Sequence, residues 1–349
     1  MKFYVSTYTE GFFGEGPNGS QGIYLCDYNE KTNTFNVLNN FDNSVNPSFI
    51  KLSTDKKSLF VACEKLPPSR LDNYLVDENG NLRFNDSVTL DYRSCCYVSL
   101  NKENKFVAVA NYGSGEVFTY SYNDEYKFDN LTSSNRNDDS LVGPNNNRQE
   151  LPHAHSVRLI EKLNTYVACD LGCDKVSFYD YKDGGYFSES SIRPLTITPG
   201  YGPRHTDNTS DGKFLYITCE LENRILTYEL VNDQYILRQD ISSIPETYSE
   251  GNTCADIHLS EDEKYAFVSN RGHDSIVQYI RLENGALKEV TSVYCDGKGP
   301  RNFAVTSNYI ICANQDSNNV SILEMMDGIL TGRVLSRQDF ISPVCIEKY

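Results

Sequence analysis

Histidine, arginine and glutamate side chains recur at corresponding places along this 349-residue chain. The segments PHAH and GPRH contain His155 and Arg204, TCE contains Glu220, and SNR contains Arg271. An arginine guanidinium is a planar fork that binds a phosphate or a carboxylate through two hydrogen bonds. Glutamate and histidine can move protons to and from a reacting group. If these side chains meet, they can hold an anion and carry out acid–base chemistry on it.

The segments that carry these residues belong to a sequence repeat. Each copy begins with a short apolar strand, usually at a Pro or a Cys. A polar turn follows, and then a second strand that is rich in Phe, Tyr, Val and Ala and ends in a polar residue. NPSFIKLSTDKKSLFVACE and GPRHTDNTSDGKFLYITCE are two of six clear copies. Strand-rich repeats of about 40 to 50 residues are typical of β-propellers. The copies open at Pro47, Cys95, His153, Pro203, Cys254, Pro300 and, for the copy described next, Pro343.

A seventh copy appears when the chain is read as a circle. SPVCIEKY at the C-terminus supplies its opening strand, and MKFYVSTYTEG and GIYLCDY near the N-terminus supply the strands that follow. The sequence therefore predicts an all-β fold, a seven-bladed β-propeller of four-stranded antiparallel blades. We expect one domain over residues 1–349, with the N- and C-terminal strands sharing one blade and closing the ring. Because tryptophan is absent, the chain is not a WD40 protein.

A polar insertion at about residues 123–150 separates the third copy from the second. Its sequence, NDEYKFDNLTSSNRNDDSLVGPNNNRQE, is poor in apolar residues that could pack. We therefore expect a long and partly mobile loop. A role as a lid is open because the loop ends beside His153, but a plain surface insertion is the favoured interpretation.

In a propeller, the blade openers and the ends of the second strands meet near one mouth of the central channel. Residues far apart in the sequence are therefore expected to form one site. The openers contribute His153, His155, Arg204, His205 and Arg301, and the strand ends include Glu220, Asn270, Arg271 and Gln315.

Composition and cysteine usage restrict the function classes. The formal net charge of -16 would repel nucleic acid. The N-terminus lacks the apolar run of a signal peptide, and no segment reaches membrane-spanning length, so we expect a cytoplasmic protein without membrane contacts. The eleven cysteines include no CxxC pair, and Cys63, Cys169, Cys219 and Cys312 end apolar strands. This pattern predicts buried reduced thiols and no metal site.

The motifs PHAHSV, GPRHT, ITCELEN, VSNRGHDSI and ICANQDSNNV, together with STYTEG and GIYLCDY, resemble those of the seven-bladed lactonase family. Its members include bacterial 6-phosphogluconolactonases and fungal 3-carboxy-cis,cis-muconate cyclases. The resemblance runs over essentially the whole chain, in order and with the same circular split. It implies the hydrolysis of a sugar-acid lactone, in the first place 6-phosphogluconolactone, without metal or organic cofactor. Lactonisation of a muconate is the alternative, so the expected partner is a small anionic lactone or muconate.

The resemblance also implies roles for particular residues. The catalytic group proposed for the cyclase branch, one histidine, two arginines and one glutamate, matches His155, Arg204, Arg271 and Glu220. In a lactonase, the two arginines would hold the anionic substrate, Glu220 would activate water, and His155 would donate a proton. Further substrate-binding residues expected at the same mouth are His153, His205, Arg301, Asn270 and Gln315.

Structural roles and a different class of function remain open. A histidine at a blade opener can simply hydrogen-bond the backbone of a neighbouring blade, and Glu220 can be an ion-pair partner of Arg204 without a catalytic part. The propeller can also be a non-catalytic interaction scaffold, because a fold does not dictate a function. Placement of the four candidate residues on the outer rim would favour the scaffold.

Overall fold

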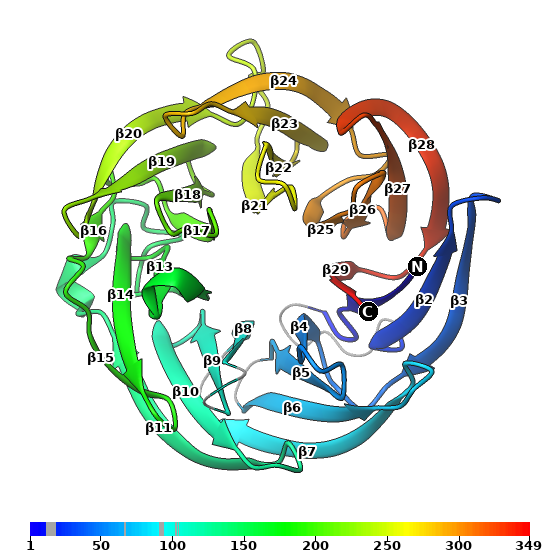
Figure 1. Cartoon of the computed structure of the whole chain (residues 1–349), viewed down its shortest axis with the longest axis horizontal. Coiled ribbons are helices and arrows are strands. Elements are labelled where there is room, and N and C mark those ends of the chain that lie inside the picture. Colours follow the sequence, from blue (N-terminus) through cyan, green and yellow to red (C-terminus); the bar gives the residue numbers. More distant parts are fainter. Residues whose placement is uncertain (12–18, 66–67, 91–93, 102, 104) are drawn as a thin grey trace.

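The computed structural model describes residues 1–11, 19–65, 68–90, 94–101, 103 and 105–349. Seven antiparallel sheets stand around a central channel, as Figure 1 shows. This confirms the predicted seven-bladed β-propeller. One sheet departs from the four-stranded pattern, because the short strand β16 (Leu195–Thr196) also pairs with β14 (Lys175–Lys182).

Each blade places one strand in each of four layers, from the channel outward. The innermost strands are β29 (Pro343–Lys348), β4 (Pro47–Leu52), β8 (Cys95–Asn101), β12 (Ala154–Ile160), β17 (Pro203–Asn208), β21 (Thr253–Leu259) and β25 (Pro300–Val305). The second strands are β1 (Lys2–Thr7), β5 (Ser58–Cys63), β9 (Phe106–Asn111), β13 (Thr165–Asp170), β18 (Phe214–Cys219), β22 (Tyr265–Arg271) and β26 (Tyr309–Asn314). The predicted openers thus lie within one residue of the observed inner strands.

The two outer layers complete the blades. The third strands are β2 (Ile23–Asn29), β6 (Ser69–Val76), β10 (Glu116–Tyr122), β14, β19 (Arg224–Val231), β23 (Ser275–Arg281) and β27 (Asn319–Met326). The outermost strands are β3 (Thr34–Phe41), β7 (Leu82–Leu90), β11 (Phe128–Arg136), β15 (Tyr186–Glu189), β20 (Gln234–Ser242), β24 (Leu287–Tyr294) and β28 (Ile329–Asp339). Two short 3₁₀ helices, η1 (Asp139–Leu141) and η2 (Glu161–Leu163), lie in connections. The described part of the chain contains no helix long and apolar enough to cross a membrane.

The ring closes through the two termini. β29 pairs with β1, so that Val5 lies opposite Ile346, and the sheet runs in the order β29-β1-β2-β3. Figure 1 shows both chain ends at this blade. Apolar residues of the closing blade pack against both neighbours: Phe3 lies in a cluster with Ile311, and Tyr4 lies in a cluster with Val61. The predicted shared blade is confirmed.

The burial of the second strand in each blade explains why the repeat can be recognised in the sequence. Strands β5 and β9 are buried along their whole length, because blades pack against both of their faces. A strand buried on both faces reads as a continuous apolar run. All eleven cysteines are buried and free, which confirms the predicted reduced thiols.

The expectation that residues 123–150 form a loop was wrong for part of the insertion. Phe128–Arg136 is the outermost strand β11, in which Arg136 pairs with Glu116 of β10. An outermost strand is largely exposed, so it needs few apolar side chains, and its polar sequence concealed it. The rest of the insertion rests on the third blade, where Gln149 Nε2 donates to the Leu171 carbonyl at 2.9 Å.

Candidate active site

Glu220 is the centre of a cluster of ionised side chains at one mouth of the channel. It directly follows strand β18, and its side chain is almost completely buried. Oε2 of Glu220 lies 2.8 Å from Nε of Arg204 and 2.9 Å from Nη2 of Arg271. Oε1 accepts a hydrogen bond of 2.5 Å from Nη2 of Arg148. Three guanidinium groups therefore surround one carboxylate.

A β-bulge repeated in the inner strands aims side chains at this cluster. The pairing register shifts between Ala154 and Ser156, between Pro203 and His205, and between Pro300 and Asn302. Each shift leaves one residue unpaired, and these residues are His155, Arg204 and Arg301. A bulge redirects the side chain of its extra residue. Three blades thus present one candidate side chain each from an equivalent position.

The charges of the cluster are strongly coupled. Burial alone would raise the pKa of Glu220, but Arg271, Arg204 and Arg148 overcome this effect and hold the pKa well below its usual value. Burial, followed by the nearby charge of Arg271, lowers the pKa of Arg204 to about 10. Glu220 is therefore a stable carboxylate, and the cluster retains more positive than negative charge.

His155 lies beside the cluster as a neutral imidazole. Its Nε2 atom is 3.9 Å from Oε2 of Glu220, and the residue is 5% exposed. Burial, and then the positive charge of Arg204, lower the pKa of His155 well below its usual value. At neutral pH the ring therefore has one nitrogen with a free lone pair.

Arg301 faces the same region from the opposite side of the channel. Its Nη2 atom lies 3.5 Å from Oε2 of Glu64, and its guanidinium lies 5.5 Å from the ring centroid of Tyr8. Tyr8 also donates a hydrogen bond of 2.5 Å to Glu64. Arg301 is close enough to Glu220 and His155 to influence the protonation of His155.

The other predicted substrate-binding residues make structural contacts. His153 Nδ1 donates to the Tyr112 carbonyl at 2.7 Å, and the His153 ring stacks on Tyr112. The side-chain amide of Asn270 is held by Ser243 and Asn252.

Two further residues complete this comparison. His205 Nδ1 donates to Asp256 at 2.7 Å, while the backbone of Gln315 donates to Gly299 at 3.0 Å. Substrate contact by His153, His205, Asn270 and Gln315 stays a prediction.

Sequence reasoning missed Arg148. This residue belongs to the polar insertion, outside every strand of the repeat, so no repeat position marked it as functional. Its side chain is 37% exposed and contacts Glu220 from the surface side. The insertion therefore contributes directly to the cluster, which is compatible with the lid interpretation.

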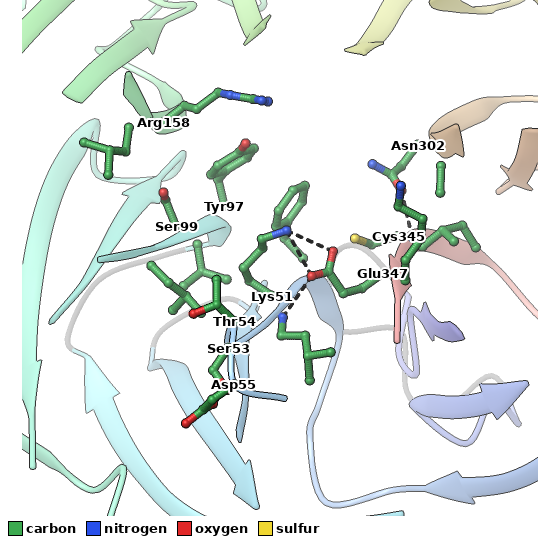
Figure 2. A pocket seen from close by; sticks show the side chains of 18 of the residues that line it. Lys51, Ser53, Thr54, Asp55, Tyr97, Ser99, Arg158, Asn302, Cys345 and Glu347 are labelled. Atoms are coloured by element: carbon green, nitrogen blue, oxygen red, sulfur yellow. Dashed lines mark hydrogen bonds and ion pairs between the residues drawn. The ribbon is translucent and has the colours of Figure 1, made fainter. Parts of the chain in front are cut away.

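A second feature missed by sequence reasoning is a cavity of about 610 Å³, lined mainly by the C-terminal parts of inner strands, among them Arg158 of β12. Figure 2 shows it between the inner strands, with Tyr97, Arg158, Asn302 and the ion pair of Lys51 with Glu347 around it. His155, Arg204, Glu220 and Arg271 are not among its described lining residues. The cavity and the arginine cluster are therefore separate places in the channel.

Comparisons with known proteins agree with the fold. A family model described as "Lactonase, 7-bladed beta-propeller" matches residues 2–347. The chain is 30% identical over 353 residues to the 6-phosphogluconolactonase of Bacillus subtilis strain 168, covering 99% of this chain and 97% of that protein.

Two more relatives extend the comparison. Identity to the 6-phosphogluconolactonase of Formosa agariphila is 29% over 311 residues, covering 86% and 87%. The crystal structure of a provisionally named 6-phosphogluconolactonase from Bacteroides fragilis matches with a TM-score of 0.89 at 26% identity, covering 99% and 97%. Because the family model spans almost the whole chain, this protein belongs to the seven-bladed β-propeller lactonase family.

Proposed function

We propose that this protein hydrolyses a sugar-acid lactone that carries an anionic group, with 6-phosphogluconolactone as its substrate. The observation that carries the proposal is the group of three guanidiniums around buried Glu220, next to the neutral imidazole of His155. Membership of the lactonase family supports the reaction class. The names of the relatives from Bacillus subtilis and Formosa agariphila support the substrate.

The arginines serve to hold the substrate. Arg204 is fixed by the carbonyl of Ala255 at 2.7 Å and by Glu220, so its position is set before substrate arrives. Arg271 and Arg148 are more exposed than Arg204, and their guanidiniums can exchange part of their contact with Glu220 for a phosphate. Arg301 offers a further positive charge. Several arginines in a partly desolvated site bind a phosphate strongly through charge-assisted hydrogen bonds.

The geometry favours His155 as the base, in place of the Glu220 suggested by the sequence. A general base works best when its pKa lies near the operating pH. Three arginines stabilise the ionised form of Glu220, so this carboxylate has little tendency to take a proton. Arg204 lowers the pKa of His155 as well, but His155 is neutral and pairs with no arginine in the described structure, so its lone pair is available to a proton of water. Glu220 then orients Arg204 and Arg271.

In the proposed reaction, His155 Nε2 takes a proton from water while the water oxygen bonds to the lactone carbonyl carbon. The carbonyl π electrons move to its oxygen, and a guanidinium stabilises the resulting oxyanion. When the carbonyl re-forms, the bond between the carbonyl carbon and the ring oxygen breaks. The ring oxygen then takes the proton from His155. The product is the open hydroxy acid, and His155 returns to its neutral form.

A paired substrate assay tests this proposal. With 6-phosphogluconolactone, we expect acid release at constant pH well above the spontaneous rate, and a lower kcat/KM with unphosphorylated gluconolactone. His155→Gln should reduce kcat on the order of 10²-fold or more, as loss of a general base does. Conversion of 3-carboxy-cis,cis-muconate, seen as loss of diene absorbance without lactone hydrolysis, would replace the lactonase with the cyclase. Inactivity on all three substrates would favour the scaffold, although the four candidate residues meet in the channel and not on the rim.

A further inference from the structure

Asp256 lies in the inner strand β21 and is saturated with hydrogen-bond donors. Oδ1 accepts from His205 Nδ1 at 2.7 Å and from the Ile257 backbone at 3.0 Å. Oδ2 accepts from Asn302 Nδ2 at 2.6 Å and from His258 Nε2 at 2.9 Å. The residue is 3% exposed. A buried carboxylate with four donors is ionised and immobile.

The fixed carboxylate determines the tautomer of His205. An ionised carboxylate is only an acceptor, so Nδ1 of His205 must carry the proton that it shares with Asp256. Burial, and then the charge of Arg204, lower the pKa of His205 to about 4. The ring is therefore neutral at pH 7, and its Nε2 atom has a lone pair.

His205 and His155 present two buried nitrogens that lack partners in the described structure. They are Nε2 of His205 and Nδ1 of His155. The two rings are 5.3 Å apart between centroids and inclined at 72°. A buried polar atom without a hydrogen-bond partner destabilises the folded state. At this ring separation a hydrogen bond between the two nitrogens, direct or through one water, would satisfy both.

We propose that His205 and Asp256 are positioning residues for His155. The lone pair of His205 Nε2 accepts the Nδ1–H of His155, directly or through one water, which leaves His155 Nε2 unprotonated on the side of Glu220. Asp256 acts through His205 and touches neither substrate nor Glu220. The proposal rests on the proposed function in one respect, because it deepens the role of His155 as the base of that reaction.

The arrangement also stabilises the intermediate state of the base. When His155 Nε2 takes the proton from water, the ring becomes an imidazolium whose Nδ1–H points to His205 and the negative charge of Asp256. Among the described residues, the charged groups that act most strongly on the two imidazoles are Arg204 from β17, Arg301 from β25, Glu220 after β18, and Asp256 with His258 from β21. The arginines favour the neutral rings before reaction, and Asp256 favours the imidazolium during it.

The tautomer can be measured without substrate. We would record ¹⁵N spectra of the histidine-labelled full-length protein at pH 7, and assign His155 by the signal lost in His155→Gln. The proposal expects the Nδ1–H tautomer for both His155 and His205. A wild-type His155 ring with its proton on Nε2 would overturn it. Because this readout needs no turnover, an inactive protein would refute the proposed function and leave the tautomer result intact.

Kinetics of Asp256→Asn provide the second readout. We expect kcat for 6-phosphogluconolactone to fall on the order of 10²-fold, with KM changed less than about twofold, because the arginines are untouched. The acidic limb of the pH profile should move to lower pH, since the imidazolium loses a nearby negative charge.

The matched control is Asp207→Asn. Asp207 is equally buried on β17, but it pairs with Arg158 on the side of the 610 Å³ cavity. The control should keep the wild-type kcat and acidic limb. Equal losses in the two variants, or an Asp256→Asn limb that does not move, would show that Asp256 is only structural.

Discussion

Arg148 and Glu220 are 72 residues apart in the sequence, yet Nη2 of Arg148 lies 2.5 Å from Oε1 of Glu220. One residue belongs to a polar insertion and the other directly follows a buried strand of the repeat. Through this contact, the polar insertion adds a residue to the ion cluster that Glu220, Arg204 and Arg271 of the blades form. Of the three guanidiniums around Glu220, that of Arg148 is the most exposed, so under the proposed function it is the one that an anionic substrate would meet first.

Glu220→Gln should be destabilising as well as inactive. The substitution leaves Arg148, Arg204 and Arg271 facing one another without a carboxylate, and an unpaired buried charge costs about 3–5 kcal/mol. Urea unfolding measures this loss, and Glu222→Gln on the exposed neighbouring position should change the free energy of unfolding by less than about 0.5 kcal/mol. Inorganic phosphate should restore stability to Glu220→Gln more than it stabilises the wild type. A variant as stable as the wild type would mean that the three arginines do not depend on Glu220.

Arg148→Ala should weaken substrate binding selectively. A charge-assisted hydrogen bond contributes about 1.5–3 kcal/mol, so KM for the phosphorylated lactone should rise roughly tenfold or more. KM for unphosphorylated gluconolactone should change little. Arg136→Ala is the control, because Arg136 pairs with Asp139 at the start of the same segment and away from Glu220. Equal KM values of the two alanine variants for the phosphorylated lactone would contradict the role assigned to Arg148.

Stability should fall as the pH drops below about 6.5. Burial lowers the folded-state pKa of His155 and His205 below the ordinary value of 6.5, to about 4 for His205. The unfolded chain therefore binds protons first, and each histidine contributes a slope of up to about 1.4 kcal/mol per pH unit between the two pKa values. Below pH 4.5 the depressed pKa of Glu220 adds a loss of the same sign.

Free energies of unfolding measured from pH 7.5 to 4 check this prediction. His205→Gln should flatten the slope of the unfolding free energy against pH. His273→Gln, at a partly exposed position, is the matched control and should keep the wild-type slope. A wild-type stability that is constant between pH 6.5 and 4 is incompatible with two buried neutral imidazoles.

Removal of residues 343–349 should destabilise the whole ring. The segment contains β29, which pairs with β1 and supplies Glu347 Oε1 as acceptor for the Leu52 backbone at 3.0 Å. We expect urea unfolding at a clearly lower midpoint, since both interfaces of the closing blade lose apolar contacts. Glu347→Gln alone should cost less than about 1 kcal/mol, because its partner Lys51 is 45% exposed. Equal midpoints for the deletion and the wild type would contradict closure by β29.

The blades could be predicted from the sequence because the two inner strands of each blade have a similar amino-acid pattern in every copy. The openers at Pro47, Pro203 and Pro300 start observed strands, and the second strands are continuous apolar runs. Outer strands carry a weaker signal, since most of their side chains face solvent. For this reason β11, with the sequence FDNLTSSNR, was read as loop.

The site was only partly predictable. His155, Arg204 and Arg301 occupy equivalent bulge positions, so the repeat alone predicts that they lie near one another. Arg148 lies outside the repeat, and the involvement of Asp256 depends on contacts between neighbouring blades. Such contacts depend on side-chain direction, which composition and spacing do not specify.

The claim that lactone chemistry occurs at the Glu220 cluster, and not in the 610 Å³ cavity, is tested most directly by two matched arginine substitutions. Arg271 pairs with Glu220 at 2.9 Å, and Arg158 pairs with Asp207 at 2.7 Å beside the cavity. The measurement is kcat/KM for acid release from 6-phosphogluconolactone. We predict a loss on the order of 10²-fold for Arg271→Gln and a near wild-type value for Arg158→Gln. An unchanged value for Arg271→Gln with a large loss for Arg158→Gln would place the reaction in the cavity and contradict this account.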